Sequence, residues 1–292
     1  MNTRDLEYFI ALTEIKNFSK VAYKFKVSQP TITFALQRLE RELDSKLILR
    51  SRGHNLAITD SGEQLLLHAR AIIKHGQLAS SEIKHLKDAK LRLGLPPTIE
   101  DRYFAVVSTK LKQHGLLNKI EAVELGSAAT LTALKNGELD LALLGSINPL
   151  AESNITSEEF DRRPFAIYVS KQHRLANGNG VYFKDLKHED FILFKSGFIH
   201  NQVISSMAKR SHFRPNVVFK SSGIHSIINM IRENVGIGFF STLMSDSNSD
   251  VVKVKLLDRD VPQFVTSIVY RESHQFNQLQ TEILNQIRAA LI

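Results

Sequence analysis

Residues 18–43, FSKVAYKFKVSQPTITFALQRLEREL, restrict the fold of this chain more than any other stretch. After Pro30, apolar residues recur at steps of four, three and four, which is the spacing of one narrow stripe along a helix. These residues are Ile32, Leu36, Leu39 and Leu43. Ser28 is expected to cap this helix, because its hydroxyl can accept a hydrogen bond from a free backbone N–H of the first turn. Pro30 suits the same turn, where a missing N–H costs nothing.

A shorter helix is expected just upstream, with Ser19 as its cap. Its apolar side carries Val21, Ala22 and Phe25. Because only residues 26–27 separate the two helices, they should meet at a sharp angle. This is the pattern of a helix-turn-helix, whose second helix enters a major groove while the first crosses the DNA backbone. A further helix is predicted over residues 3–15, behind the motif.

The face opposite the apolar stripe is polar and basic. It carries Gln29, Thr33, Phe34, Gln37 and Arg41. It is flanked by Lys20, Lys24, Lys26 and Arg38. Amide and hydroxyl groups are suited to base edges, and Lys and Arg to phosphates. A helical hairpin inside a larger core is the alternative interpretation, and this face favours DNA binding over it.

Length and composition limit the class of protein. The 292 residues are too many for one core of common size, so two or three domains are expected. The net charge of +8 and the pI of about 9.5 favour a polyanionic partner. There is no cysteine, which excludes disulfides, thiol nucleophiles and zinc fingers and is compatible with a reducing cytoplasm. Neither a signal peptide nor a membrane span is expected, because no long apolar run occurs.

Residues 46–58, KLILRSRGHNLAI, are predicted to form two short β segments around a turn. A basic hairpin directly after a recognition helix is typical of a wing. In a wing, Arg50, Arg52 and His54 would face phosphates or a minor groove. The alternative is a solvated turn that touches nothing.

Residues 60–89 are predicted to form one long helix. Asp60 and Glu63 have the spacing of a capping box. The apolar stripe consists of Leu65, Leu66, Ala69, Ile72, Ile73, Leu78, Ile83 and Leu86. A helix of roughly 28 residues reaches about 40 Å, which is too long for a small domain to bury. The stripe is therefore expected to pair with the same helix of another copy of the chain.

From residue 91 onward, strand and helix patterns alternate. Strands are expected at 91–95, 120–125, 139–144, 165–170, 191–194, 217–220, 236–240, 251–257 and 264–270. Helices are expected at 99–114, 127–135, 200–209, 224–234 and 276–287. The βαβαβ order of residues 91–144 predicts a parallel sheet with right-handed crossovers.

The motif SQPTITFALQRLERELDSKLILR, followed by LAITDSGEQLL, resembles the N-terminal signature of LysR-type transcriptional regulators. The runs GELDLALLG, HRLA and IRENVGIGFF also fall where that family places similar runs. The resemblance implies an α+β multidomain protein, with a winged helix-turn-helix and a long linker helix before a two-lobed α/β effector domain similar to periplasmic binding proteins. The implied boundaries are 1–59 for DNA binding, 60–90 for the linker and dimerisation helix, and 91–292 for the effector domain. Lobe I would comprise 91–161 and 266–292, and lobe II would comprise 162–265.

The expected DNA contacts lie at the start of the recognition helix and in the wing. They are Ser28, Gln29, Pro30, Thr31, Thr33, Phe34, Gln37, Arg38, Arg50 and Arg52. Thr33 stands where the family usually has serine. Phe34 departs from the polar or basic residue common at its position. Its ring would either meet a thymine methyl group or pack on the wing, which leaves the operator sequence open.

In the family the ligand lies in the cleft between the lobes. The corresponding residues here are Pro97, Thr98, Ser127, Ala128, Ser196, Gly197, Phe198 and Ser222. Hydroxyls and backbone N–H groups at helix starts suit an anion, so a small carboxylate is the expected effector. Each serine is equally explained as a plain helix cap. Within the family, the helix-turn-helix residues most resemble activators of malolactic fermentation genes, which makes malate a candidate.

The resemblance also implies partners. They are double-stranded DNA, a second copy of the chain paired through the linker helix, and a homotetramer acting on two stretches of promoter DNA. Contact with RNA polymerase is compatible with an activator, and the expected location is the cytoplasm. No cofactor and no metal is expected.

Two other classes of protein fit the sequence less well than a regulator. For an enzyme, the run Gly236-Ile237-Gly238 is only a fragment of the dinucleotide-binding pattern and ends a helix instead of beginning one. There is no G-x-S-x-G, H-E-x-x-H or P-loop motif. For an architectural DNA binder without a ligand, the α/β region of some 200 residues is unnecessary.

Overall fold

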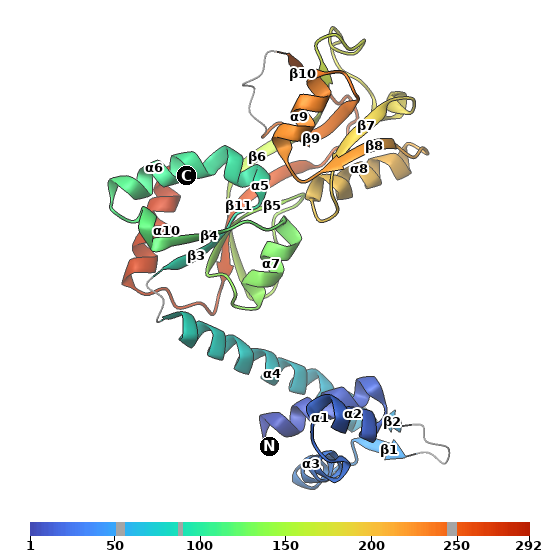
Figure 1. The fold of residues 1–292 in the computed structure, drawn as a ribbon, viewed down its shortest axis with the longest axis vertical. Helices are drawn as coiled ribbons and strands as arrows, with labels where there is room; N and C mark the ends of the chain where they lie inside the picture. The colour runs from blue at the N-terminus through green and yellow to red at the C-terminus, as the bar shows by residue number, and fades with distance from the viewer. Residues whose placement is uncertain (51–55, 87–89, 244–249) are drawn as a thin grey trace. The chain divides into compact units, whose positions relative to one another are not determined.

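The structure is a computed structural model that describes residues 1–50, 56–86, 90–243 and 250–292. The chain separates into two compact units, Met1–Lys87 and Asp88–Ile292, and each is described here by itself (Figure 1). Arg52 and His54, expected in the wing, lie outside the described residues.

The first unit has three helices around one core. They are α1 Thr3–Ile15, α2 Phe18–Phe25 and α3 Gln29–Glu42. The predicted stripe of α3 is buried at Ile32, Leu36 and Leu39, and it packs with α1 and α2. The prediction for Leu43 is wrong. This residue is 41% exposed, because α3 ends at Glu42 and Leu43 is only its C-cap.

Two predicted helix caps are also wrong. The cap of α2 is Asn17, whose side chain accepts from the backbone N–H of Lys20 at 2.9 Å, so Ser19 lies inside the helix. Ser28 does stand at the N-cap position of α3, but its hydroxyl caps no backbone N–H. It lies 2.9 Å from the hydroxyl of Thr31 and pairs with it instead.

The β hairpin and the long helix follow in the same unit. Strands β1 Ile48–Arg50 and β2 Leu56–Ile58 pair antiparallel, as predicted. The long helix is α4 Asp60–Leu86. Its cap is Thr59 and not the predicted Asp60–Glu63 box, because the Thr59 hydroxyl accepts from the backbone N–H of Gly62 at 2.9 Å. The same hydroxyl donates to the carbonyl of Lys46 at 2.6 Å, which ties the helix start to the hairpin.

The second unit is built on one mixed sheet, with strand order β4-β3-β5-β11-β6-β9-β7-β8 and β10 paired to β6. Its strands are β3 Leu91–Gly94, β4 Ile120–Val123, β5 Leu141–Ser146, β6 Ile155–Ser170, β7 Asp190–Phe194, β8 Asn216–Ser221, β9 Ile237–Ser241, β10 Val251–Lys255 and β11 Gln263–Arg271. Strand β3 pairs parallel with β4 and β5 at one end, and β7 pairs parallel with β8 and β9 at the other. Each end is thus the core of one lobe, and the pairing of β3 with β4 and β5 is the one that the βαβαβ order predicts.

Helices cover both lobes. They are α5 Pro97–Ile99, the π-helix η1 Glu100–Phe104, α6 Ala105–Gln113, α7 Ser127–Lys135, α8 Ile199–Arg210, α9 Ile224–Arg232 and α10 Gln278–Leu291. Two short 3-10 turns are η2 Leu117–Lys119 and η3 Phe183–Leu186. Helix α10 packs against α6, so the C-terminus returns to the lobe that contains β3 (Figure 1).

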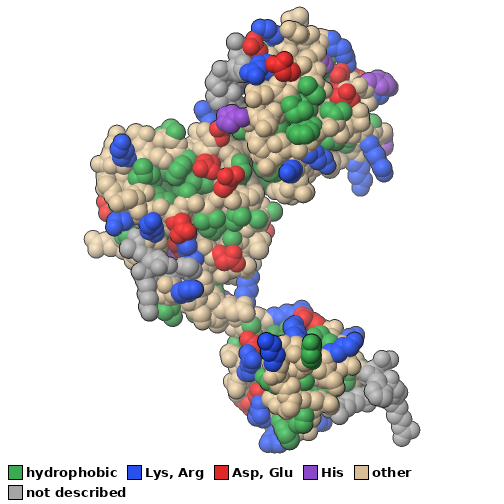
Figure 2. Space-filling model, in the orientation of Figure 1, with side chains coloured by type: hydrophobic (Ala, Val, Ile, Leu, Met, Phe, Trp, Pro, Cys, Tyr) green, Lys and Arg blue, Asp and Glu red, His purple; other side chains and the backbone are tan. Residues whose placement is uncertain are grey.

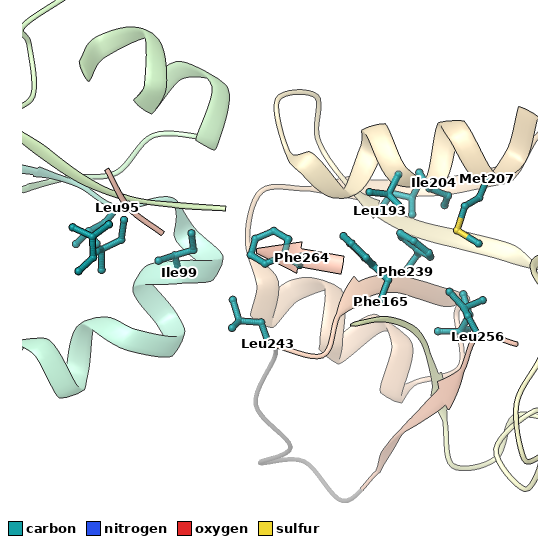
Figure 3. Packing of buried hydrophobic residues seen from close by; sticks show 14 of the residues in the cluster. Leu95, Ile99, Phe165, Leu193, Ile204, Met207, Phe239, Leu243, Leu256 and Phe264 are labelled. Atoms are coloured by element: carbon teal, nitrogen blue, oxygen red, sulfur yellow. The ribbon is translucent and has the colours of Figure 1, made fainter. Parts of the chain in front are cut away.

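Strand β6 joins the two lobes: its residues 155–164 pair antiparallel with β11, and its residues 165–170 pair with β9 and β10. Phe264 of β11 lies beside Phe165 and Phe239, near Leu243 (Figure 3). Its ring also fills the space above Gly145 of β5, where an added Cβ would come within 2.1 Å of the ring. The cores of the two lobes therefore meet on these crossover strands. No described helix is long and apolar enough to cross a membrane.

Candidate DNA-reading face and effector cleft

The structure places the predicted base-reading residues together on the outer face of α3. Gln29, Pro30 and Gln37 are exposed, Thr33 is half-buried, and Phe34 is 59% exposed. The buried stripe of the helix holds this face outward. Lys and Arg side chains are spread over the visible face of the same unit (Figure 2). The open ring of Phe34 is available for an apolar contact with a partner, as the thymine interpretation requires.

Arg38 has a structural partner that the sequence did not reveal. Its Nε and Nη2 donate to the two carboxylate oxygens of Asp5 at 3.0 and 2.6 Å. The hydrogen bond with Asp5 raises the pKa of Arg38. This pair ties the recognition helix to α1. The backbone of Arg50 ends β1, whereas its side chain lies outside the described residues.

Glu40 is a second contact that sequence reasoning missed. It is 8% exposed, and its carboxylate accepts from the backbone N–H of Leu47 at 3.0 Å and from Lys46 at 2.8 Å. Because Leu47 directly precedes β1, Glu40 fixes the hairpin against α3. A glutamate within the apolar stripe was the available signal, since a buried carboxylate requires hydrogen-bond partners.

In the effector domain, a cavity of about 540 Å³ lies at the start of α8. Of the predicted effector residues, Ala128, Ser196, Gly197 and Phe198 line it. Lys220 also lines it and adds a positive charge that was not predicted. The other predicted residues, Pro97, Thr98, Ser127 and Ser222, do not line this cavity.

Those four residues stand at the starts of helices. Pro97 and Thr98 begin α5, and Thr98 is buried. Ser127 is the first residue of α7, and Ser222 precedes Gly223, the N-cap of α9. The hydroxyls of Thr98, Ser127 and Ser222 are not caps, because no side chain caps α5, α7 or α9. The plain-cap interpretation of Ser127 and Ser222 is therefore wrong.

The N-termini of α7 and α8 meet across the two lobes. A Cβ added to Gly126, the N-cap of α7, would lie 3.4 Å from the carbonyl oxygen of Gly197, which precedes the N-cap of α8. Neither helix has a side-chain cap. The first backbone N–H groups of a helix lack carbonyl partners within it and carry partial positive charge. Two such ends at one cavity suit an anion.

A polar cluster lies on the crossover strands. Tyr103 of η1 donates to the carboxylate of Asp161, and Nε of Arg163 donates to the same oxygen at 2.9 Å. Burial, followed by the hydrogen bond with Asp161, raises the pKa of Tyr103 well above its usual range. Burial acts to raise the pKa of Asp161, but hydrogen bonds from Tyr103 and Arg163 hold it below its usual range. The Asp161 carboxylate is therefore ionised near neutral pH and braces η1 against β6.

His200, the second residue of α8, lies in an aromatic environment. It is 3% exposed, and its ring centroid is 5.0 Å from that of Phe194 and 5.3 Å from that of Phe264. Neither ring nitrogen has a hydrogen-bond partner among the described residues. Burial lowers the pKa of His200 to about 3, so the imidazole is neutral. Across the described ranges, no group of three or more His, Asp or Glu side chains could hold a metal ion.

An exposed helix-turn-helix face in one unit and a two-lobed α/β domain with an anion-suited cavity in the other define a ligand-responsive DNA-binding regulator. The chain belongs to the LysR family of transcriptional regulators. Residues 3–63 match the bacterial regulatory helix-turn-helix protein, lysR family, and residues 84–291 match the LysR substrate binding domain. The resemblance seen in the sequence is thereby confirmed. Proteins of this family regulate transcription and are not enzymes.

Individual proteins are similar over most of the chain. The malolactic fermentation system transcriptional activator of Lactococcus lactis is 30% identical over 297 residues, covering 99% of this chain and 98% of that protein. CbnR complexed with its target DNA matches with a TM-score of 0.53 at 17% identity, over 99% of this chain and 100% of CbnR. The effector binding domain of QuiR in complex with shikimate matches with a TM-score of 0.57 at 15% identity, over 69% of this chain and 95% of that domain. At these identities the two structures show a shared fold.

Proposed function

We propose that a small carboxylate binds between the lobes and controls how paired chains hold promoter DNA. The observation that carries this proposal is the meeting of the uncapped N-termini of α7 and α8 at one cavity. A carboxylate there would accept hydrogen bonds from backbone N–H groups of both lobes and face the positive charge of Lys220. The expected DNA contacts on α3 and the effector contacts at the helix starts remain part of this proposal.

Malate is the specific candidate. It is supported by the similarity to the malolactic fermentation system activator of Lactococcus lactis. The complex of the QuiR domain with shikimate, which is also a small carboxylate, supports the ligand class. No cofactor is part of the proposal.

The second part of the proposed function is that two chains pair through α4. Within its own unit, this helix leaves two residues of the predicted stripe exposed, Ile72 at 37% and Ile83 at 63%. Covering such side chains with the same helix of a second copy would stabilise a dimer by burying apolar area. Two dimers would form a tetramer on promoter DNA in the cytoplasm, with RNA polymerase as a further partner. Ile83→Asp should then shift the chain to monomers in analytical ultracentrifugation.

Ligand binding can switch the regulator only if the ligand binds two arrangements of the protein with different affinities. Strand β6 pairs with β11 over residues 155–164 and with β9 and β10 over residues 165–170, so rotation of the lobes must bend it. A ligand that holds the starts of α7 and α8 together would favour one rotation. The two arrangements would present the paired DNA-binding units differently and so change the bend of bound DNA.

Thermal unfolding in the presence of ligands tests the effector site. L-malate should raise Tm in a concentration-dependent manner, and at 100 times Kd the stabilisation should be about 2.7 kcal/mol. The uncharged diamide of malate should give no shift. Other small carboxylates, shikimate among them, should be screened in parallel.

Two lysine variants locate the ligand. Lys220→Gln removes the charge at the cavity and should reduce the shift, whereas Lys209→Gln, exposed near the other end of α8, should keep it. An undiminished shift in Lys220→Gln would place the ligand elsewhere. No shift with any carboxylate, together with unchanged DNA binding, would refute the proposed ligand class.

A further inference from the structure

Tyr23 is the most exposed large hydrophobic residue in the described part of the chain. Its exposed fraction is 88%, against 59% for Phe34 in the same unit. A tyrosine this open buries almost none of its ring within its own unit, although rings usually gain stability by leaving water. None of the sequence motifs explains why the ring of Tyr23 is exposed.

Helix α2 presents Tyr23 beside the recognition helix. Residues four apart share a helix face, so Ser19 and Tyr23 lie in one row. Ser19, at the start of this row, donates from its hydroxyl to the side-chain amide oxygen of Gln29 at 3.3 Å. Gln29 is the first residue of α3. The row that carries Tyr23 therefore borders the end of α3 that is expected to read bases.

The backbone that carries Tyr23 is firmly held. Phe18, Val21 and Ala22 of α2 are buried, and the ring of Phe25 packs edge-on against Tyr8 of α1 at 4.9 Å. The helix closes at Lys26, whose N–H bonds back to the carbonyls of Ala22 and Tyr23. Tyr23 is therefore exposed on a helix that is held in place on both sides, and its exposure is not caused by fraying of the helix.

The charges around Tyr23 favour an anionic partner. The sequence of α2, FSKVAYKF, contains two lysines and no Asp or Glu. Lys26 is the C-cap of the helix, three residues after Tyr23, and Lys24 is the direct neighbour of Tyr23 in the chain. A phenol among ammonium groups is a good donor to a phosphate oxygen, and tyrosine is among the side chains that commonly contact DNA phosphates.

We propose that Tyr23 donates from its hydroxyl to a phosphate of the DNA strand that borders the major groove entered by α3. In a helix-turn-helix, the first helix crosses the backbone while the second lies in the groove. Tyr23 shares its row of α2 with Ser19, which contacts the first residue of α3. The ring covers the adjoining deoxyribose, and the contact fixes the position of α3 without reading a base. Tyr23 is therefore a positioning contact for DNA recognition.

Binding to two duplexes tests the proposal. One carries the DNA upstream of the chain's own gene, and the other has a random sequence. Tyr23→Phe removes only the hydroxyl, so both affinities should fall by about 3- to 10-fold, the worth of one hydrogen bond. The dependence of log K on log salt should keep its slope, because a neutral hydroxyl releases no counterion. Lys26→Asn is the matched control, because asparagine tolerates the positive φ of 55° at this position. If Lys26 contacts a phosphate, the slope of log K against log salt should fall by about 0.9 in this variant.

A second experiment identifies the phosphate. Neutral methylphosphonate is placed at each backbone position of the upstream duplex in turn. At one position per half-site, the loss of affinity seen with the unaltered chain should disappear in Tyr23→Phe, because the hydrogen bond is already gone. The Tm of Tyr23→Phe should match that of the unaltered chain, since the hydroxyl is exposed.

Three results would overturn the assignment. Unchanged affinity of Tyr23→Phe for both duplexes would remove Tyr23 from the interface. A loss confined to the upstream duplex would make it a base-reading residue. Normal DNA binding with a change in oligomeric state would assign the ring to a protein contact.

Discussion

Arg38 of α3 donates two hydrogen bonds to the buried carboxylate of Asp5 in α1, from Nε at 3.0 Å and from Nη2 at 2.6 Å. Asp5 is 3% exposed, whereas the side chain of Arg38 is 54% exposed. The pair therefore lies at the rim of the core, with one member inside and one outside. It sets the position of the recognition helix relative to the helix behind it.

Asp5→Asn is expected to destabilise the DNA-binding unit by about 1–2 kcal/mol, because it removes a charged acceptor from two hydrogen bonds. The estimate is reduced for the exposure of Arg38 to solvent. Urea unfolding followed by circular dichroism measures it. Glu7→Gln is the control, since it breaks an exposed 3.2 Å pair with Arg4 and should change stability by less than about 0.5 kcal/mol. Equal effects of the two variants would contradict a structural role for Asp5.

Gly145→Ala is expected to destabilise the effector domain by about 1–3 kcal/mol, the usual range for overpacking. An alanine Cβ would lie 2.1 Å from the nearest ring carbon of Phe264. Phe264→Leu should relieve the clash, so the double variant should be more stable than the sum of the single effects predicts. Calorimetry of the four proteins measures this coupling. Additive effects would mean that the ring of Phe264 does not occupy the space above Gly145.

His200 makes stability depend on pH. Because its pKa falls from 6.5 when unfolded to about 3 when folded, the unfolded chain binds a proton below pH 6.5 that the folded chain does not. The contribution of His200 is thus fully present above pH 6.5 and is lost as the pH falls, by about 1.4 kcal/mol per unit. At pH 5 the loss relative to pH 7 is about 2 kcal/mol.

His200→Phe and His200→Leu should abolish this part of the pH dependence. Their stabilities between pH 7 and pH 5 should fall by about 2 kcal/mol less than that of the unaltered chain, as measured by urea unfolding at each pH. Two variants are used because phenylalanine is larger than histidine and could strain the aromatic cluster. Parallel pH profiles for all three proteins would show that His200 is hydrated or paired in solution.

Local patterns predicted those elements whose signal lies within a few neighbouring residues. The helix at 127–135 was predicted at both ends, since an apolar stripe and flanking glycines mark it. The local pattern predicts strand β6 only at 165–170, and the family resemblance adds a crossover near 160–163, but the strand begins at Ile155. Its first half, TSEEFDRR, is polar and carries no strand pattern, because it is a crossover that gains its order from pairing with β11.

Contacts between distant residues were beyond the reach of the sequence. Asp5 and Arg38 are separated by 33 positions, and nothing near either residue specifies the other. Likewise, the predicted effector residues gave the correct helix starts, but only the folded chain shows that α7 and α8 meet while Pro97 and Ser222 stand away from their cavity. In the sequence, Tyr23 resembles a core residue because it stands next to a buried stripe, and only the fold shows that its ring is exposed.

The most direct test of the account concerns the outer face of α3. Affinities of Gln29→Ala for the upstream duplex and for a random duplex give its sequence discrimination. If Gln29 reads a base edge, the variant should lose about 1–3 kcal/mol on the upstream duplex and little on the random one. Lys24→Gln, a change of charge on α2, should weaken both equally. Equal losses of Gln29→Ala on the two duplexes would contradict the claim that this face of α3 recognises the operator.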